Sequence, residues 1–239
     1  MQWFLSGEGA SDLGIGSPDG FKPGPMGLLL AKMAASMGGQ LNFEIQATFE
    51  YVGKAQLGEE AKGMRPVKKS VQLPGAKREK ETGYFFTNAR ALARIAGRHQ
   101  AVHSDTVIAV LFRDADGTAS AGRGHWHDKY NSMLDGFAEE HLTTGVAMLP
   151  NPKSEAWLLY ALKSAPYQNC AALEDRSGND NSPNSLKGEL VQIAVVPDGD
   201  VIKWACEQIG SGEVDPAQID MPSFNKFRER LHEVLDARH

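Results

Sequence analysis

The chain has 239 residues and a mass of 25.9 kDa, which is enough for one domain with its own hydrophobic core. Hydrophobic residues make up 41% and charged residues 23% of the chain, and the mean hydropathy is −0.36; these values argue against a disordered chain and against a membrane protein. The formal net charge of −5 argues against a protein that coats nucleic acid non-specifically, although it allows a local basic surface.

The cysteine content and the N-terminus indicate a cytoplasmic protein. Cys170 and Cys206 are too few for a disulfide scaffold and lack the paired spacing of a structural zinc site. The apolar N-terminal run has no basic segment before it and meets Glu8 at once, unlike a signal peptide. No stretch approaches the roughly 20 apolar residues that span a bilayer. We therefore expect no membrane partner.

The first part of the chain predicts two strands around one helix. An apolar run at 2–6 predicts a short buried strand, and the Gly- and Pro-rich segment 7–27 predicts a long loop. A helix is predicted at 26–37, where two glycines stop it. The alternation of apolar and polar residues over 43–52 predicts an edge strand with one wet face.

A basic insertion is predicted at about 59–81. Its part from 62 to 80 carries a charge of about +6 and could clamp the phosphate backbone of a nucleic acid, in which case binding would weaken steeply with salt. A solvated flexible loop is the alternative. The candidate contacts are Lys62, Arg65, Lys68, Lys69, Lys77, Arg78 and Lys80.

The rest of the chain continues the alternation of helices and strands. The predicted elements are a helix at 82–98, a strand at 106–112, a helix at 126–141, a strand at 145–149, a helix at 154–163 and C-terminal helices at 186–196, 200–209 and 223–237. Continuous apolar strands between helices predict an α/β fold with a mainly parallel, Rossmann-like sheet covered on both faces. We expect one α/β domain at 1–165 and a C-terminal helical cap at 166–239 packed on it.

Acidic residues follow three of the predicted strands. Glu8 and Asp12 follow the first strand, Asp114 and Asp116 follow the third, and Glu155 follows the fourth. The carboxyl ends of parallel strands share one edge of a sheet, so these carboxylates should converge there. Crowded carboxylates repel one another unless a cation lies among them, and oxygen ligands select a hard ion such as Mg²⁺ or Mn²⁺. The pattern therefore predicts metal-dependent phosphoryl chemistry.

Two of these acidic segments resemble motifs of the Toprim (topoisomerase-primase) family. Gly7-Glu8-Gly9-Ala10-Ser11-Asp12 resembles its Glu-Gly-x-Thr/Ser-Glu/Asp motif, and Asp114-Ala115-Asp116 resembles its Asp-x-Asp motif. The chain is most similar to bacterial Toprim-like proteins related to the overcoming-lysogenization-defect nucleases of phage-defence systems. These have segments similar to Ser154-Glu155-Ala156-Trp157-Leu158-Leu159 and Asn184-Ser185-Leu186-Lys187. The resemblance covers roughly residues 1–195.

The resemblance implies a Toprim fold and a metal-dependent nuclease that acts on DNA or RNA. Two metal ions would activate the attacking water and stabilise the leaving oxygen. The implied roles are general acid/base or metal ligand for Glu8, metal ligand for Asp114 and Asp116, support of the metal site for Asp12 and Glu155, and a cation that offsets transition-state charge for Lys187.

Two other functions remain open on the sequence. Asp114-Ala115-Asp116-Gly117-Thr118 matches the nucleophile motif of haloacid-dehalogenase phosphatases, with Asp114 as nucleophile, Asp116 as acid/base and the acidic partner motif near Asp180. The chain could instead be a non-catalytic partner of an ATPase, because Toprim-like relatives of this kind are often held by an ATPase subunit. This chain carries no Gly-x-x-x-x-Gly-Lys-Ser/Thr loop, so the ATPase would be another chain.

Overall fold

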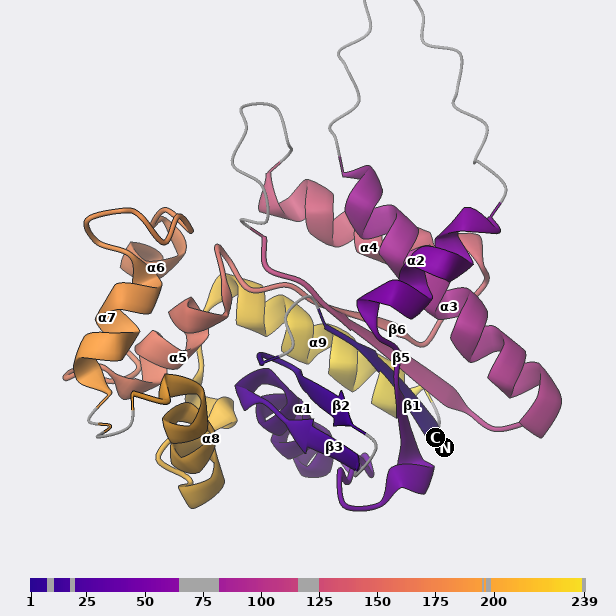
Figure 1. Ribbon diagram of the computed structural model, residues 1–239, viewed down its shortest axis with the longest axis horizontal. Helices are drawn as coiled ribbons and strands as arrows, with labels where there is room; N and C mark the ends of the chain where they lie inside the picture. Colours follow the sequence, from indigo (N-terminus) through magenta and orange to yellow (C-terminus); the bar gives the residue numbers. More distant parts are fainter. Residues whose placement is uncertain are drawn as a thin grey trace, which may run out of the picture.

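The computed structural model describes residues 1–7, 11–17, 20–64, 82–115, 125–194, 196 and 199–237. Its centre is a four-stranded, all-parallel sheet in the order β4–β1–β5–β6 (Figure 1). The strands are β1 (Gln2–Ser6), β4 (Phe49–Tyr51), β5 (Val107–Phe112) and β6 (Gly145–Met148). Every residue of β5 and β6 is buried, which explains their unbroken apolar sequence. The predicted parallel α/β fold is confirmed.

One face of the sheet packs against helices from both ends of the chain. The helices on this side are α1 (Pro25–Ser36), α5 (Ser154–Leu162), α8 (Val201–Ser211) and α9 (Pro222–Asp236). Trp157 packs edge-to-face on Phe224 and stacks on Phe227, with ring centroids 4.9 and 6.0 Å apart. These rings and Trp3 of β1 belong to one buried cluster, so the C-terminal helices share the hydrophobic core of the sheet.

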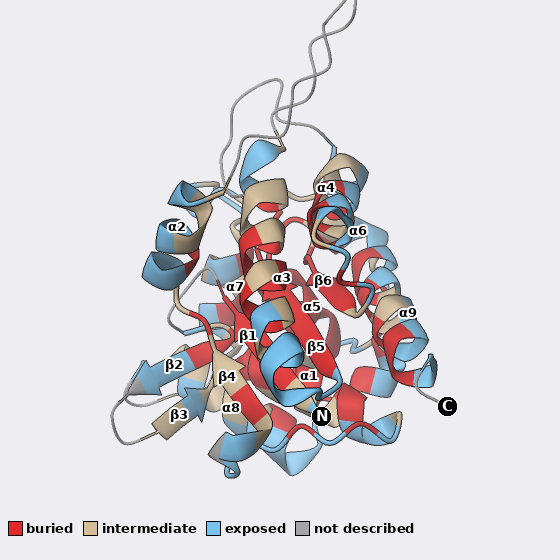
Figure 2. Ribbon diagram, turned by 90° about the vertical axis from the view of Figure 1, so that its right-hand side faces the viewer, coloured by how far each residue is buried: buried red, intermediate tan, exposed pale blue. Residues whose placement is uncertain are grey.

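The opposite face is covered by α2 (Lys54–Lys62), α3 (Gly83–His103) and α4 (Trp126–Glu139). Figure 2 shows the strands buried behind this layer. Phe4, Leu111 and Ala147 point into it from the sheet. The close approach of α3 and α4 requires Gly136, because a Cβ there would lie 2.4 Å from the carbonyl oxygen of Phe86.

The remaining helices lie beyond the carboxyl ends of the strands. They are the short α6 (Ala171–Glu174) and α7 (Leu186–Ile193), which lies against α5 (Figure 1). A 3₁₀ turn, Pro216–Gln218, precedes α9. None of the described helices combines the length and the apolar character that crossing a membrane demands.

Three local predictions differ from the structure. The strand predicted at 43–52 is only Phe49–Tyr51, after a 3₁₀ turn at Gln46–Thr48, because Phe43 packs on the rings of Phe21 and Phe49 instead of pairing along the sheet. The segment predicted as a loop contains the hairpin β2 (Gly14–Ser17) and β3 (Gly20–Pro23). The helix α2 (Lys54–Lys62) was not predicted. The hairpin and α2 lack a clear apolar period, so their sequences give little signal.

Candidate active site at the carboxyl edge of the sheet

The strand order places the ends of β1, β5 and β6 side by side. The chain passes from β1 to its neighbour β4 on one side and then returns to β5 on the other side. This reversal makes the β1–β5 boundary a topological switch point, where parallel α/β sheets form the crevice that binds ligands. The segments after β1, β5 and β6 therefore meet where the fold favours a site.

Ser154, the first residue of α5, joins three carboxylates from these segments. Its backbone N–H donates to Asp114 Oδ1 at 2.9 Å. Its Oγ lies 3.1 Å from Asp12 Oδ1 and 3.4 Å from Glu155 Oε2. Ser154 is buried, so its contacts hold the three acidic residues together at a point shielded from water. Asp12, Asp114 and Glu155 converge although they are far apart along the chain.

The hydroxyl of Ser154 has too few protons for its neighbours. It carries one hydrogen and can donate it to Asp12 or to Glu155, but not to both at once. A hydrogen bond with the second carboxyl requires that this carboxyl itself be protonated. The arrangement therefore favours an added proton or an added cation.

The pKa values of the two carboxyls agree with this shortage. Burial raises the pKa of Asp12 and of Glu155 above their ordinary values, because low-dielectric surroundings disfavour the charged form. The negative charge of Asp12 raises the pKa of Glu155 further. Lys153 acts against both shifts, and Lys187 acts against that of Asp12.

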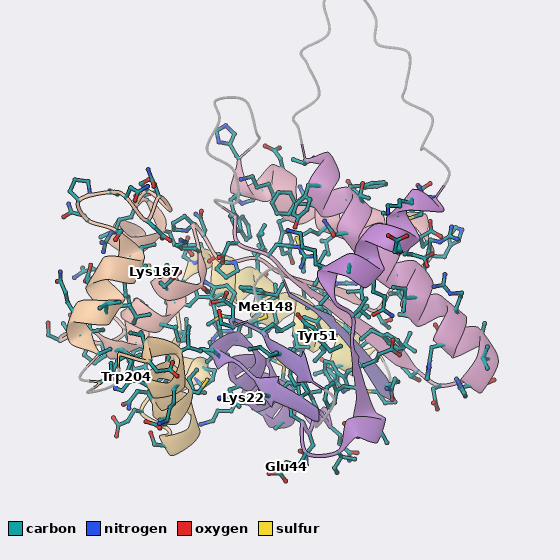
Figure 3. The ribbon with its side chains drawn as sticks, in the orientation of Figure 1. Lys22, Glu44, Tyr51, Met148, Lys187 and Trp204 are labelled. Carbon is teal, nitrogen blue, oxygen red and sulfur yellow. The ribbon has the colours of Figure 1, made fainter. Side chains whose placement is uncertain are left out.

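Two lysines border the acidic residues and share one carboxylate. Lys153, at the N-terminal end of α5, donates to Asp180 Oδ1 at 2.6 Å, and only 11% of its side chain is exposed. Lys187 Nζ, in the first turn of α7, lies 3.9 Å from Asp180 Oδ2. Figure 3 shows Lys187 on α7, to the left of Met148 at the end of β6. Positive charge thus accompanies the carboxylates on this side.

A buried cation, Arg113, immediately precedes Asp114 in the chain. Arg113 is fully buried; its guanidinium donates to the carbonyl of Phe112 at 2.6 Å and to Asn88 Oδ1 at 3.2 Å, and it lies 5.8 Å from the ring centroid of Tyr84. A buried charge is costly, and these contacts with α3 and with the end of β5 compensate part of that cost.

The structure places only some of the predicted site residues. It brings Asp12, Asp114 and Glu155 together and places Lys187 near them through Asp180. Lys62 pairs instead with Glu59 at 2.6 Å on the exposed end of α2. The predicted residues outside the described part of the chain are Glu8, Asp116, Arg65, Lys68, Lys69, Lys77, Arg78 and Lys80. Their roles stay predictions.

Residues that sequence reasoning did not assign also belong to this edge. Ser154 and Lys153 come just before Glu155, and Arg113 comes just before Asp114. Their position after a buried strand was the available signal. The pairing of Lys153 with Asp180 depends on how the turn-rich segment after α6 folds back, and no local pattern predicts it.

The donor atoms suit a hard divalent cation, but the described ligand set is incomplete. Asp12, Asp114 and Glu155 offer carboxylate oxygens, which Mg²⁺ and Mn²⁺ prefer. Within the described ranges, no group of three or more His, Cys, Asp or Glu side chains is arranged to hold a metal ion. A complete site would therefore need a ligand from the predicted residues outside those ranges, or a movement of these carboxylates.

Comparison of the chain with protein-family models, with curated proteins and with solved structures finds no match.

Proposed function

We propose that this protein is a metal-dependent phosphodiesterase of the Toprim type, which cleaves DNA or RNA and acts as an effector of phage defence. The observation that supports the activity is the convergence of Asp12, Asp114 and Glu155 on Ser154 at the switch point of the sheet. The defence role and the Toprim assignment come from the resemblance of the acidic motifs.

Each residue of the edge has a role in this proposal. Asp114 and Asp12 would hold Mg²⁺ or Mn²⁺, with Glu8 and Asp116 as further proposed ligands. The metal, when bound, would supply an activated water and neutralise charge on the leaving oxygen. Ser154 orients Asp114 through its backbone N–H. Glu155, whose pKa is raised by burial, can keep a proton at Oε2 for the leaving oxygen.

A cleavage assay with matched acidic variants tests the proposal. Purified protein is mixed with plasmid, single-stranded DNA and tRNA in Mg²⁺ or Mn²⁺. We expect cleavage that is lost with a chelator and in Asp114→Asn and Glu8→Gln. Asp105→Asn is the control, because Asp105 lies just before β5, at the opposite end of the same strand. Uncut substrates, or full activity in Asp114→Asn, would refute the nuclease.

One observation favours a phosphatase as the second candidate. The Lys153–Asp180 pair brings the Asp180 region to the edge that carries Asp114, as the haloacid-dehalogenase alternative requires. In this mechanism Asp114 attacks phosphorus, the ester oxygen leaves with a proton, and water then hydrolyses the aspartyl phosphate. Hydrolysis of an aryl phosphate with phosphate trapped on Asp114, and no cleavage of nucleic acid, would establish it.

A further inference from the structure

Two ammonium groups from different helices converge on a single carboxylate beside the candidate active site. Lys153 belongs to the start of α5 and Lys187 to the first turn of α7. Their Nζ atoms lie 2.6 Å from Oδ1 and 3.9 Å from Oδ2 of Asp180, one lysine at each carboxylate oxygen. A tetrahedral phosphate group can likewise place one oxygen near each of two such ammonium groups.

The side chains of Lys153, Lys187 and Asp180 are buried to different extents, and the difference allows an anion from solution to take the place of the Asp180 carboxylate. The side chain of Lys153 is 11% exposed, whereas those of Asp180 and Lys187 are 49% and 62% exposed. A lysine as buried as Lys153 needs an anion close to it, because leaving such a charge unpaired is costly. Asp180 reaches the solvent and comes from the turn-rich segment before α7. An anion from solution can therefore replace the carboxylate of Asp180 while Lys153 stays in place.

The lysine pair is electrostatically coupled to the acidic residues. The charges of Lys153 and Lys187 both lower the pKa of Asp12, and Lys153 also lowers that of Glu155. Lys153 also directly precedes Ser154, whose contacts join Asp12, Asp114 and Glu155, so an anion held by the two lysines would lie close to the carboxylates that we propose as metal ligands. It would be a group of the substrate itself and not a ligand of a remote surface.

We propose that Lys153 and Lys187 form a subsite for a phosphate group of the substrate, and that Asp180 occupies this subsite until the phosphate displaces it. This inference rests on the proposed function, since it assigns the subsite to the same site. Asp180 then acts as a built-in competitor: it keeps the buried lysine neutralised and weakens the binding of any single phosphate. A phosphodiester of a nucleic acid and a free phosphate ion share this chemistry.

Calorimetric titration with inorganic phosphate, in chelator and without nucleic acid, tests the subsite apart from catalysis. We expect Asp180→Asn to bind phosphate about threefold to tenfold more tightly than the unaltered protein, because the competing carboxylate charge is gone. Adding Lys187→Gln or Lys153→Gln to Asp180→Asn should weaken that binding by about tenfold. Lys187 is exposed, so its variant keeps the test valid if the Lys153 variant unfolds in a thermal melt.

A second exposed ion pair supplies the control. Lys226 pairs with Glu229 at 2.7 Å on α9, so Glu229→Gln also releases a lysine but should leave phosphate affinity unchanged. An equal gain in Glu229→Gln, or no gain in Asp180→Asn, would overturn the subsite. The same titrations with a short single-stranded oligonucleotide show which kind of phosphate the subsite binds. If Asp180→Asn also binds the oligonucleotide more tightly, the ligand is a nucleic acid phosphodiester. If only the affinity for inorganic phosphate increases, that assignment is wrong. A protein that cleaves nucleic acid without the predicted phosphate response would refute the subsite alone.

Discussion

Two buried serines, Ser154 and Ser223, lie close to carboxylates in this fold, but Ser223 contacts one carboxylate whereas Ser154 contacts three. Glu174 Oε1 accepts hydrogen bonds from the backbone N–H and the Oγ of Ser223, at 2.9 and 2.6 Å. Trp157 Nε1 in turn donates to Ser223 Oγ at 2.8 Å. One carboxylate thus has several donors, and the cluster ties α6, α5 and α9 together.

The cluster around Ser154 brings three carboxylates to one serine. Ser154 offers one N–H and one O–H to Asp12, Asp114 and Glu155, and the desolvation of Asp12 and Glu155 outweighs the backbone hydrogen bonds that lower their pKa values. Stability alone does not favour three crowded carboxylates, because their repulsion and burial cost free energy. The difference suggests that the Ser223 cluster serves the fold and that the Ser154 cluster serves a ligand. Four experiments test whether the two clusters differ in this way.

The largest expected effect is on activity. Asp114→Asn should slow metal-dependent cleavage on the order of 100-fold, because it removes a proposed charged ligand from the reaction centre. Glu174→Gln, which keeps the side-chain shape and one acceptor oxygen for Ser223, should leave the rate within about twofold at a temperature where both variants are folded. Initial rates on the same substrate measure both. Comparable losses in the two variants would show that the comparison is wrong.

For the free energy of unfolding we expect the opposite: a substitution in the Ser223 cluster should cost more than one in the Ser154 cluster. Glu174→Ala leaves the buried donors of Ser223 without their acceptor, and we expect the free energy of unfolding to fall by about 2 kcal/mol. Glu155→Ala removes a carboxylate from the crowded cluster and should change stability by less than about 1 kcal/mol. Urea denaturation of the two variants gives both values. A larger loss in Glu155→Ala would assign a structural role to the Ser154 cluster.

Added metal should stabilise only one cluster. At ten times its dissociation constant, Mn²⁺ should raise the free energy of unfolding by about 1.4 kcal/mol, since a ligand that binds the folded state shifts the equilibrium towards it. Thermal melts with and without Mn²⁺ measure the shift. We expect Asp114→Asn to lose this stabilisation and Glu174→Gln to keep it. A shift that survives in Asp114→Asn would place the metal elsewhere.

The smallest effect concerns pH. Burial raises the pKa of Asp12 above its ordinary value of 3.8, so the folded chain holds this proton more tightly than the unfolded chain. The resulting contribution to stability is fully present below 3.8 and is lost as the pH rises through the raised pKa. Asp12→Asn should therefore flatten the fall in metal-free stability above this pH and make the protein more stable at pH 7 than the unaltered chain. Urea denaturation at a series of pH values measures the difference. If the unfolding free energy of Asp12→Asn depends on pH in the same way as that of the unaltered protein, burial does not raise the pKa of Asp12.

The sequence was most informative where hydrophobicity and position act together. The apolar run that forms β5 predicted a strand buried on both faces, and the acidic residue after it, Asp114, lies at the carboxyl edge. By contrast, Phe43 looked like part of a strand but packs in a ring cluster with Phe21 and Phe49. Such tertiary contacts override a local period of two.

The cationic part of the site was harder to predict for a different reason. Asp180 lies in a polar, turn-rich stretch that resembles any exposed loop, and its pairing with Lys153 exists only after α6 and α7 fold against α5. Lys187 was singled out by resemblance alone, and its distance from Asp180 became visible only in three dimensions. Spacing along the chain does not encode contacts of this kind.

The position of β1 inside the sheet has a consequence for biosynthesis. Its two neighbours, β4 and β5, both come later in the chain, and Gln2 pairs with Val107. As a nascent polypeptide leaves the ribosome, the first strand must wait for β5 before it gains both partners, and its residues Trp3, Phe4 and Leu5 stay without their final cover until then. A polypeptide released before β5 is made would expose these side chains and be a natural target for chaperones and proteases.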